Sequence, residues 1–494
     1  MSTAIPTYDL YIDGTFVSGS AGDRFPSINP STGKTWATVP FADSDMVDRA
    51  VTAANRAFKT WSHTSPKQRA KLVRELSARL AEAADDVARI ETIDTGKLYK
   101  ETRGLAHGSA ALYAYYAGLA ENLDGHVPPS ADGRLLNIVS REPLGVVAAV
   151  VPWNSQLLLS VHKLGPALVT GNTVVVKASE DAACPLLELA RVIDKVGFPP
   201  GVINFITGPG EPTGVALTSH PLVRRIAFTG GAETARRILP NTTHNLARVS
   251  LELGGKSPMI VFDDADLDNA VNGMVSGIFA ASGQSCGAAS RLLLQDNIYD
   301  AFLDKLSERA SRIRLGDPLD PQTEMGPLAT ARQRERIGRL VDESLSMPGS
   351  RVVFRGERPA AMPDGFFFEP LIIAFDDQEF PVVRNELFGP VLSVLRFSDE
   401  DEAIALADDS DYAFAAGIFT QNFPRAHRVA SRIQAGKIAV NTYRVSTPNV
   451  PFGGFRLSGY GREGGADALK DYTDTKAILV DVTGDPIPDP FVMA

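Results

Sequence analysis

The chain has 494 residues, and its composition and charge narrow the classes of protein to which it can belong. Hydrophobic residues make up 44% and charged residues 22%, with no bias toward repeats or low complexity, which is typical of an ordinary soluble protein. The net charge of −10 argues against nonspecific nucleic-acid binding. A chain of this length is too long for one hydrophobic core and predicts about three domains.

The cysteine count and the N-terminus bear on the compartment. Two cysteines cannot form a disulfide framework, so we expect a reducing compartment. Residues 1–6 contain no basic region followed by an apolar core, so we expect no signal peptide. The longest apolar runs, such as Val146 to Val151, are far too short to span a bilayer. We therefore expect a cytoplasmic protein with no membrane or nucleic-acid partner.

The first quarter of the chain is predicted to be mainly helical. Alanine and leucine recur at helical spacing through residues 43–120. Residues 123–143 break this pattern, because Asp124-Gly125, Pro128-Pro129 and Asp132-Gly133 are turn signals around short extended pieces. We expect a hairpin or a strand excursion there.

From residue 145 onward, apolar strands alternate with helices. We expect strands at 145–151, 173–176, 202–206, 225–228 and 249–253, and helices at 157–169 and 185–196. A second alternation has strands at 258–262, 291–294, 391–395, 415–419 and 437–440, a helix at 299–313, and an extended tail at 478–482. Such alternation predicts an α/β protein whose parallel sheets are covered on both faces and bind ligands at the carboxyl ends of their strands.

Cys286 lies in a run of small residues, Ser282-Gly283-Gln284-Ser285-Cys286-Gly287. A thiol beside glycines can be approached closely by another molecule, and a thiolate is a strong nucleophile. A lone cysteine is more often a small core hydrophobe, so a catalytic role depends on the other residues. The second cysteine, Cys184, opens an apolar helix and is expected to be structural.

Two polar side chains follow predicted strands. Glu252 ends an apolar strand, and a carboxylate beside apolar residues has a raised pKa, which suits a general base. An exposed glutamate at the edge of a strand is the alternative. Asn154 follows Trp153 at the end of another strand. Its amide could donate to a developing oxyanion, or it could cap the helix that begins near Leu157.

Several residues are candidates for binding a dinucleotide. Lys177 and Glu180 follow the second parallel strand, where a ribose lies in a dinucleotide fold; the alternative is a solvated pair. Residues 208–214, with Gly210 and Gly214, depart from the usual glycine motif, and a plain turn is the alternative. Gly230 belongs to a glycine-opened helix start that suits close cofactor approach. We find no metal-ligand spacing and expect no metal site.

Taken in order, the motifs resemble those of the aldehyde dehydrogenase superfamily over nearly the whole chain. They are Pro-Trp-Asn at 152–154, Lys-x-Ser-Glu at 177–180, Phe-Thr-Gly at 228–230, Glu-Leu-Gly-Gly-Lys at 252–256, Gly-Gln-x-Cys at 283–286, Glu-x-Phe-Gly-Pro at 386–390 and Pro-Phe-Gly-Gly at 451–454.

The resemblance implies a fold in three parts. The first is a Rossmann-like NAD(P) domain, assigned here to residues 1–122 and 143–254. The second is an α/β catalytic domain, residues 255–455. The third is a small β excursion for oligomerisation, residues 123–142 and 470–494, which implies a homodimer or homotetramer.

The resemblance also implies the chemistry. Cys286 would attack an aldehyde, with the oxyanion held by the Asn154 amide and the Cys286 N–H. Hydride transfer to the nicotinamide would turn the thiohemiacetal into a thioester, and Glu252 would activate the water that releases the acid. The implied cofactor contacts are Lys177 and Glu386 at the riboses, Glu180 at the adenosine side, Phe388 near the nicotinamide, and Trp153, Gly210, Gly214 and Gly230.

Glu180 favours NAD over NADP, because a carboxylate at this position repels a 2′-phosphate. The chain departs from the family pattern at three places. Gly231 replaces a common serine, so one polar contact near the cofactor is missing. Asn385-Glu386 replaces a common pair of glutamates but keeps the ribose-binding position, and residues 485–494 extend past the usual last strand.

The residues expected around the substrate are small or polar. They include Ser155, His162, Arg444 and Ser446. They predict a wide pocket for a bulky or polar aldehyde, and Arg444 suggests one that carries an acid, because a guanidinium holds a carboxylate by two hydrogen bonds. The alternative is that Arg444 points to solvent or bonds to the backbone.

Two other functions compete with aldehyde oxidation to a free acid. A CoA-acylating enzyme would resolve the thioester with CoA, but such relatives often lack the general-base glutamate. A non-catalytic protein that keeps the fold is disfavoured by the joint presence of Cys286, Asn154, Glu252, Lys177 and Glu386.

Overall fold

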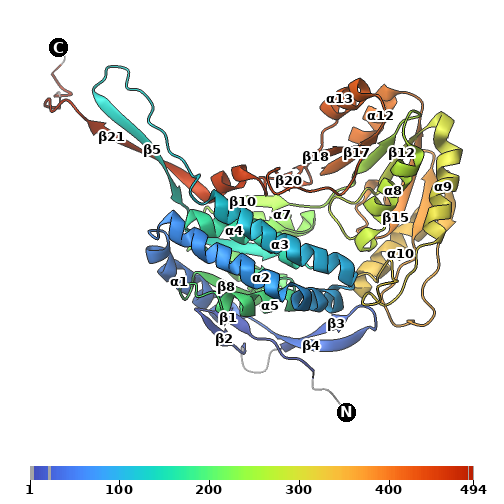
Figure 1. Ribbon diagram of the computed structural model, residues 1–494, viewed down its shortest axis with the longest axis horizontal. Helices are drawn as coiled ribbons and strands as arrows, with labels where there is room; N and C mark the ends of the chain where they lie inside the picture. Colours follow the sequence, from blue (N-terminus) through green and yellow to red (C-terminus); the bar gives the residue numbers. More distant parts are fainter. Residues whose placement is uncertain (1–4, 20–23, 488, 493–494) are drawn as a thin grey trace.

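The computed structural model describes residues 5–19, 24–487 and 489–492. Figure 1 shows two α/β bodies and a ribbon of two strands that extends away from them. The predictions for residues 1–6 and for the extension at 485–494 therefore lie partly outside the described residues.

The first body contains an eight-stranded sheet. Its strands are β1 (Leu10–Ile12), β2 (Thr15–Val17), β6 (Val146–Val151), β7 (Thr173–Ala178), β8 (Ile203–Thr207), β9 (Val223–Thr229), β10 (Arg248–Glu252) and β20 (Gly459–Tyr460). They lie in the order β2-β1-β8-β7-β6-β9-β10-β20. The central strands β8, β7, β6, β9 and β10 are parallel to one another. Antiparallel strands lie at both edges of the sheet.

Helices cover both faces of this sheet. They are α1 (Ser44–Trp61), α2 (Pro66–Thr95), α3 (Tyr99–Leu119), α4 (Gln156–Thr170), α5 (Cys184–Asp194), α6 (Val215–Thr218) and α7 (Ala232–Asn241). Val147 and Val151 of β6 pack in one core with α2 to α5, whereas Val146 and Ala148 pack in another with α1, α6 and α7. Both faces of β6 are thus buried, as its continuous apolar sequence predicts.

The second body contains a seven-stranded sheet in the order β13-β14-β15-β12-β11-β17-β18. The strands are β11 (Pro258–Val261), β12 (Arg291–Gln295), β13 (Ser350–Arg355), β14 (Leu371–Phe375), β15 (Val391–Phe397), β17 (Ala415–Phe419) and β18 (Lys437–Val440). All are parallel except β13, which lies antiparallel at one edge.

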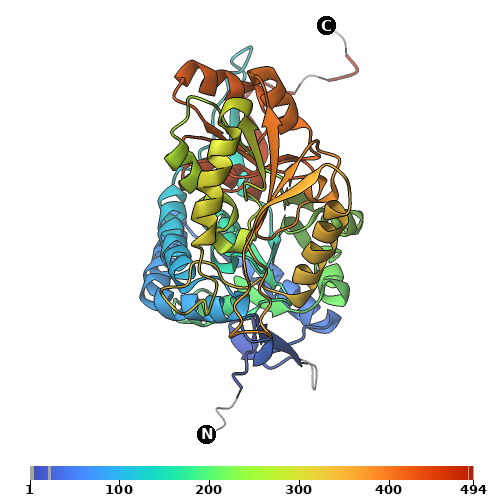
Figure 2. The ribbon, with the colours of Figure 1, turned by 90° about the vertical axis from the view of Figure 1, so that its right-hand side faces the viewer.

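The helices of the second body also lie on both sides of their sheet. They are α8 (Leu267–Ile278), α9 (Tyr299–Ser311), α10 (Ala331–Leu345), α11 (Pro381–Arg384), α12 (Glu400–Asp408) and α13 (Phe423–Arg432). Met259 and Val261 of β11 pack with α8 and α9, and Ile260 packs with α10 to α13. Figure 2 shows α9 and α10 on opposite sides of the strands.

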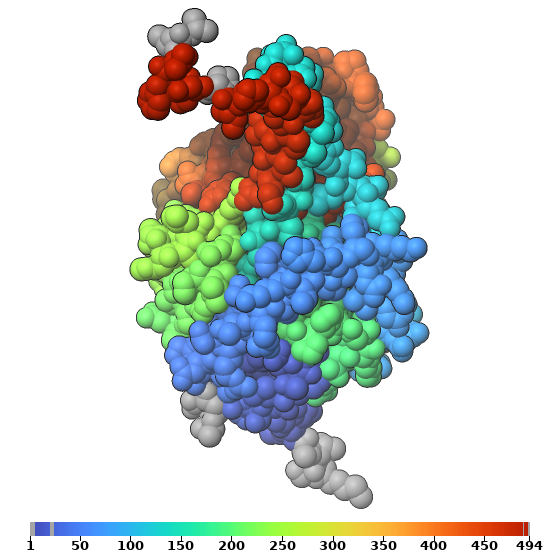
Figure 3. Space-filling view, turned by 90° about the vertical axis from the view of Figure 1, so that its left-hand side faces the viewer, coloured from blue at the N-terminus to red at the C-terminus, as the bar shows by residue number. Residues whose placement is uncertain are grey.

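The projecting ribbon pairs β5 (Leu135–Pro143) antiparallel with β21 (Thr473–Asp481). Figure 3 shows the two segments side by side at the edge of the molecule. The turn-rich segment at 123–143 therefore forms a strand excursion, and its main partner is the C-terminal strand rather than a second strand of its own hairpin. Two smaller ribbons pair β3 (Arg24–Asn29) with β4 (Lys34–Pro40) and β16 (Tyr412–Ala413) with β19 (Phe455–Arg456).

The predicted α/β class with two parallel sheets is confirmed, and each strand predicted from residue 145 onward is present within a few residues of its expected bounds. The short N-terminal strands β1 to β4, the edge strand β13 and its neighbour β14 were not predicted. In the part of the chain that the structure describes, no helix is long and apolar enough to cross a membrane. The domain boundaries stay a prediction.

Candidate active site

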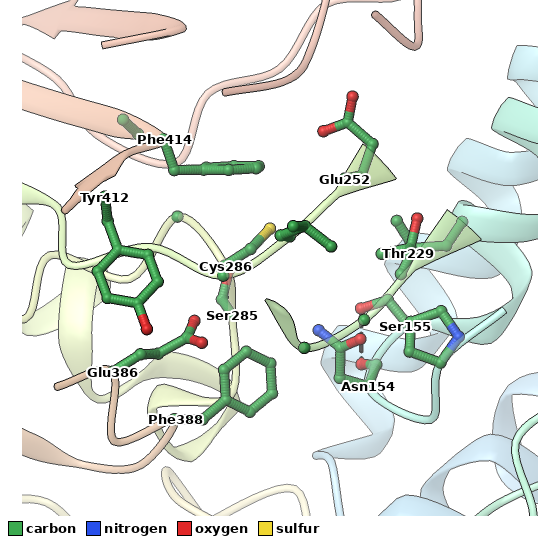
Figure 4. A pocket seen from close by; sticks show the side chains of 18 of the residues that line it. Asn154, Ser155, Thr229, Glu252, Ser285, Cys286, Glu386, Phe388, Tyr412 and Phe414 are labelled. Atoms are coloured by element: carbon green, nitrogen blue, oxygen red, sulfur yellow. Dashed lines mark hydrogen bonds between the residues drawn. The ribbon is translucent and has the colours of Figure 1, made fainter. Parts of the chain in front are cut away.

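A cavity of about 710 Å³, here called the central cavity, is lined by residues of both bodies. Figure 4 shows that Cys286, Glu252, Asn154, Glu386 and Phe388 surround it. The sequence-predicted residues in its lining are Trp153, Asn154, Ser155, His162, Gly230, Glu252, Cys286, Glu386, Phe388, Arg444 and Ser446. Lys177, Glu180, Gly210 and Gly214 are not among the lining residues.

The first body contributes residues at the carboxyl ends of its parallel strands. Glu252 is the last residue of β10, Thr229 is the last residue of β9, and Asn154 lies shortly after β6. Because β6, β9 and β10 are adjacent and parallel, these side chains meet at one edge of the sheet. This edge faces the Cys286 segment of the second body across the central cavity.

The segment before Cys286 has a strained backbone. Ala281 and Ser282 have φ values of 51° and 54°, in the left-handed region that few residues other than glycine adopt. Gly283 follows with φ 73°, and a Cβ there would lie 2.2 Å from the Gly389 carbonyl oxygen. Glycine is therefore required at this position, which gives a structural reason for the run of small residues in the sequence.

Side-chain hydrogen bonds hold this strained segment. Ser282 Oγ donates to the Gly326 carbonyl at 2.8 Å. Gln284 Nε2 donates to the Ala281 carbonyl at 3.2 Å, and Gln284 Oε1 accepts from the Ala329 N–H at 2.9 Å. Cys286 is thus carried by a fixed segment while its residue stays partly exposed.

The Asn154 side chain bonds across to the Cys286 segment. Its Nδ2 donates to the Gln284 carbonyl at 3.1 Å. Ser155 occupies the N-terminal cap position of α4, without a side-chain capping bond. Asn154 is therefore not the helix cap, which was the alternative role considered for it from the sequence. An amide has two N–H groups, and the bond to Gln284 fixes the direction of the other.

Glu252 is 1% exposed, so it is not the exposed strand-edge glutamate that the sequence left as an alternative. Neither of its carboxylate oxygens has a hydrogen-bond partner among the described residues. Burial, followed by the charge of Glu463, raises the pKa of Glu252 well above its usual value. Glu463 is itself buried and pairs with Lys163 at 2.5 Å. The direction of this shift agrees with the one expected from the apolar sequence around Glu252.

Cys286 and Glu386 are also affected by burial and by neighbouring charge. Burial, then the carboxylates of Glu252 and Glu386, raises the pKa of the Cys286 thiol. Burial raises the pKa of Glu386 to about 7, although Glu386 Oε1 accepts from the Gly255 N–H at 2.9 Å. A Cβ on Gly254 would lie 1.9 Å from Glu386 Oε2, so only glycine allows this carboxylate its position.

Of the remaining cofactor candidates, Trp153 and Phe388 line the cavity, whereas Lys177, Glu180, Gly210 and Gly214 do not. The Trp153 and Phe388 rings meet edge to face, with centroids 5.4 Å apart. Lys177 Nζ and Glu180 Oε2 pair at 3.0 Å, with the Glu180 side chain 42% exposed. Gly210 and Gly214 bound a short helical turn before α6.

The candidate substrate residues differ in their bonding. Arg444 Nη1 donates to the carbonyls of Ser276 and Ala280, at 3.3 and 2.9 Å, so the backbone-bonded alternative is the one observed. His162 stacks on Phe452, its Nδ1 has no partner among the described residues, and burial lowers its pKa.

Sequence reasoning missed several charged residues of the site. Lys97 and Lys437 line the central cavity, and the Lys163–Glu463 pair lies beside Glu252. Lys163 left a usable signal, because it interrupts the apolar pattern of a predicted buried helix. Lys97 and Lys437 left none, since a lysine in a turn or at the start of a strand usually points to solvent.

Comparison with known proteins gives a consistent result. The aldehyde dehydrogenase family model matches residues 16–478. A (Z)-2-((N-methylformamido)methylene)-5-hydroxybutyrolactone dehydrogenase from Acinetobacter baylyi is 49% identical over 98% of this chain and 99% of its own. A hydroxyisobutyraldehyde dehydrogenase from Mycolicibacterium austroafricanum is 38% identical over 98% and 95%.

Solved structures agree. PnpE, from Pseudomonas sp. WBC-3, in complex with nicotinamide adenine dinucleotide, has a TM-score of 0.95 and 41% identity, covering 97% of this chain and 99% of PnpE. The motifs, the fold and the family match extend over nearly the whole chain. This chain therefore belongs to the aldehyde dehydrogenase family and is an NAD(P)-dependent oxidoreductase that converts an aldehyde into a carboxylic acid.

Proposed function

We propose that Cys286, Asn154 and Glu252 carry out the oxidation, and the observation that supports this is their meeting in one cavity between the two bodies. The Cys286 thiolate attacks the aldehyde carbon, a C–S bond forms, and the carbonyl electrons move to oxygen. The free N–H of the Asn154 amide and the Cys286 backbone N–H donate to that oxyanion. The bond from Asn154 to Gln284 holds the amide in place for this task.

Glu252 completes the cycle. When bound, NAD would supply the acceptor for the hydride of the thiohemiacetal carbon, and this would leave a thioester on Cys286. Glu252 takes a proton from water, the water oxygen bonds to the thioester carbon, and the C–S bond breaks to release the acid. The buried carboxylate of Glu252 supports this role. No described residue donates a hydrogen bond to it, so both of its oxygens are free to accept the proton of the water.

The residues present fit a dinucleotide. Gly230 and Gly231 precede α7 without side chains, and nothing lies within 4 Å of a Cβ placed on Gly231. Glu386 would accept from a ribose, with Trp153, Gly230 and Phe388 around the nicotinamide. Lys177 and Glu180 would bind the other ribose, with Gly210 and Gly214 near the phosphates.

The proposed domains follow from these roles. Residues 1–122 and 143–254 form the cofactor domain, and residues 255–455 form the catalytic domain. Residues 123–142 and 470–494 form the oligomerisation part, in a homodimer or homotetramer. The exposed apolar side chains of the ribbon support this assignment: Leu136, Ile478, Leu479 and Val480.

We further propose an acid-bearing aldehyde as the substrate. Five lysine and arginine side chains line the central cavity, and this proposal uses three of them: Lys97, Lys437 and Arg444. Both hydrogen bonds of the Arg444 guanidinium within the described residues use Nη1, so Nε and Nη2 remain available for a carboxylate. The small side chains of Ser155 and Ser446 leave room for a bulky group.

The Acinetobacter baylyi relative adds support. Its name describes a 5-hydroxybutyrolactone. A lactone of this kind is the ring-closed form of a γ-oxo acid, so its open form carries both an aldehyde and a carboxylate. A site with cations near the nucleophile suits such a molecule.

A cytoplasmic location is also proposed. The support is that both cysteines are free, which fits a reducing compartment. Recovery of the activity outside the cytoplasmic fraction would contradict it.

Replacing Glu252→Gln should separate the two halves of the reaction. The thioester should still form, giving a burst of NADH, whereas turnover should fall about 100-fold because no base activates water. In the wild-type enzyme, turnover should rise with pH through the raised pKa of Glu252, since only the carboxylate accepts a proton. Stopped-flow absorbance of NADH across a pH series measures both. Turnover that survives in the variant would show that another group is the base.

Replacing Arg444→Ala should lower kcat/KM for a γ-oxo acid about tenfold and leave that for the neutral amide analogue nearly unchanged, because a charge-assisted hydrogen bond is lost. Steady-state kinetics with both substrates measures the ratio. Arg351→Ala, which changes an exposed arginine on β13, is the control. An equal acid-to-amide ratio in wild type and Arg444→Ala would refute the proposal.

NAD should bind more tightly than NADP, because the Glu180 carboxylate repels the 2′-phosphate. Glu180→Gln should reduce the ratio of the Kd for NADP to the Kd for NAD by at least about tenfold. Calorimetric titration with each dinucleotide measures the Kd values. Glu82→Gln, at an exposed glutamate of α2, should leave the difference unchanged. Tighter binding of NADP by the wild-type protein would contradict the preference.

Sedimentation velocity should find a dimer or tetramer, and Leu479→Asp should shift it to a smaller species, because a buried carboxylate would disfavour the interface. Leu479 is 63% exposed in the single chain. Val352→Asp, at an exposed valine of β13, should not change the assembly. A monomeric wild-type protein would rule out the oligomer.

A further inference from the structure

The turn between α2 and α3 connects the two bodies beside the central cavity. Gly96 ends α2 with φ 77°, and a Cβ there would lie 2.6 Å from the Pro327 side chain. The Tyr99 N–H at the start of α3 donates to the Pro318 carbonyl at 2.9 Å. The turn belongs to the first body and packs directly on the second.

Lys97 in this turn bonds to the residue proposed to hold the oxyanion. Its Nζ donates to the Asn154 carbonyl and to Ser155 Oγ, each at 3.0 Å. Ser155 Oγ in turn donates to the Asn154 carbonyl at 2.6 Å. Lys97 is 5% exposed, and among the described residues its bonds go to these two oxygens and not to a carboxylate. Burying an ammonium group costs free energy because the charge loses its contact with water, so the location of Lys97 beside Asn154 needs an explanation.

Glu101, one helical turn further on, bonds to the segment that carries Cys286. Its Oε1 accepts from the Ala281 N–H at 2.8 Å, and its Oε2 accepts from the Leu98 N–H at 3.4 Å. Ala281 is the first of the two left-handed residues before the nucleophile. Bonds to ionised groups are stronger than neutral ones, so this carboxylate is well suited to hold a strained backbone.

We propose that Lys97 and Glu101 are positioning residues that together set the geometry between the Asn154 amide and Cys286. Asn154 and Cys286 lie on different bodies, and the Asn154–Gln284 bond joins Asn154 to the Cys286 segment. Lys97, in the turn, holds the Asn154 backbone, and Glu101, in the first turn of α3 directly after it, holds the Cys286 segment. The inference rests on the roles proposed above for Asn154 and Cys286. Misplacement by about 1 Å can cost about 100-fold in rate.

A double-mutant cycle tests how Lys97 acts. Lys97→Met removes the ammonium and keeps most of the stem. It should slow the single-turnover burst of NADH about tenfold and leave the Kd for NAD within about twofold. Asn154→Ala should slow the burst about 100-fold or more, because the oxyanion loses a donor. On the Asn154→Ala background, Lys97→Met should have an effect below about twofold, since it acts through that amide.

The outcomes of the cycle are distinct. An equal loss from Lys97→Met on both backgrounds would overturn the inference, because a general structural role is additive. No loss from Asn154→Ala alone would instead contradict the proposed oxyanion contact. Lys100→Met is the matched control: Lys100 Nζ donates to the Thr323 carbonyl at 2.8 Å, a contact of the same turn with the second body that does not touch the site. It should leave the burst unchanged.

Glu101 provides a second test that does not depend on Lys97→Met folding. Glu101→Gln keeps an oxygen acceptor for the Ala281 N–H, whereas Glu101→Leu removes it. The burst should stay within about threefold of wild type in Glu101→Gln and fall about tenfold in Glu101→Leu, with NAD affinity unchanged in both. A wild-type burst in Glu101→Leu would overturn the inference.

Discussion

The central cavity places a thiol and two carboxylates in one buried space, and their mutual electrostatics governs the rest of the site. Burial and the two carboxylates raise the pKa of Cys286, and burial raises those of Glu252 and Glu386. Each of these shifts favours the neutral form of its group, although Lys97, Lys437 and Arg444 also line the cavity. A cation that enters the cavity reverses this preference and favours the thiolate. The ionisation of the Cys286 thiol thus depends on the charge of the molecule that occupies the cofactor side of the cavity.

The parts of this site that could be predicted depend on local sequence. Glu252 and Asn154 follow continuous apolar strands, and neighbouring parallel strands bring their ends together whatever the rest of the chain does. Cys286 was identified by its small neighbours, and Gly283 shows why they are small. The strand periodicity was sufficient for the sheets, and the order of motifs singled out residues that meet in the central cavity.

The parts that could not be predicted depend on contacts between distant segments. β5 pairs with β21 across more than half of the chain; the family resemblance implied this partner, but no local pattern specifies it. Lys97 Nζ bonds to the Asn154 carbonyl, which follows a strand far away in the sequence, so no local pattern reveals this contact. Arg444 was expected at the substrate, but its bonds to the Ser276 and Ala280 carbonyls follow from how α8 ends, which its own sequence does not reveal.

The strain before Cys286 connects stability with function. Two left-handed residues, Ala281 and Ser282, cost of order 1–3 kcal/mol each. Three hydrogen bonds offset this cost in free energy. Ser282 Oγ and Gln284 Nε2 each donate one, worth about 1 kcal/mol, and the Glu101 carboxylate accepts one that is worth more because it is charge-assisted. The balance is close, so removing one bond should loosen this segment before it unfolds the protein. Glu101 lies in the first turn of α3, directly after the turn whose Lys97 holds Asn154. Loosening there changes the position of the nucleophile relative to the oxyanion donor, so catalysis should be lost before stability.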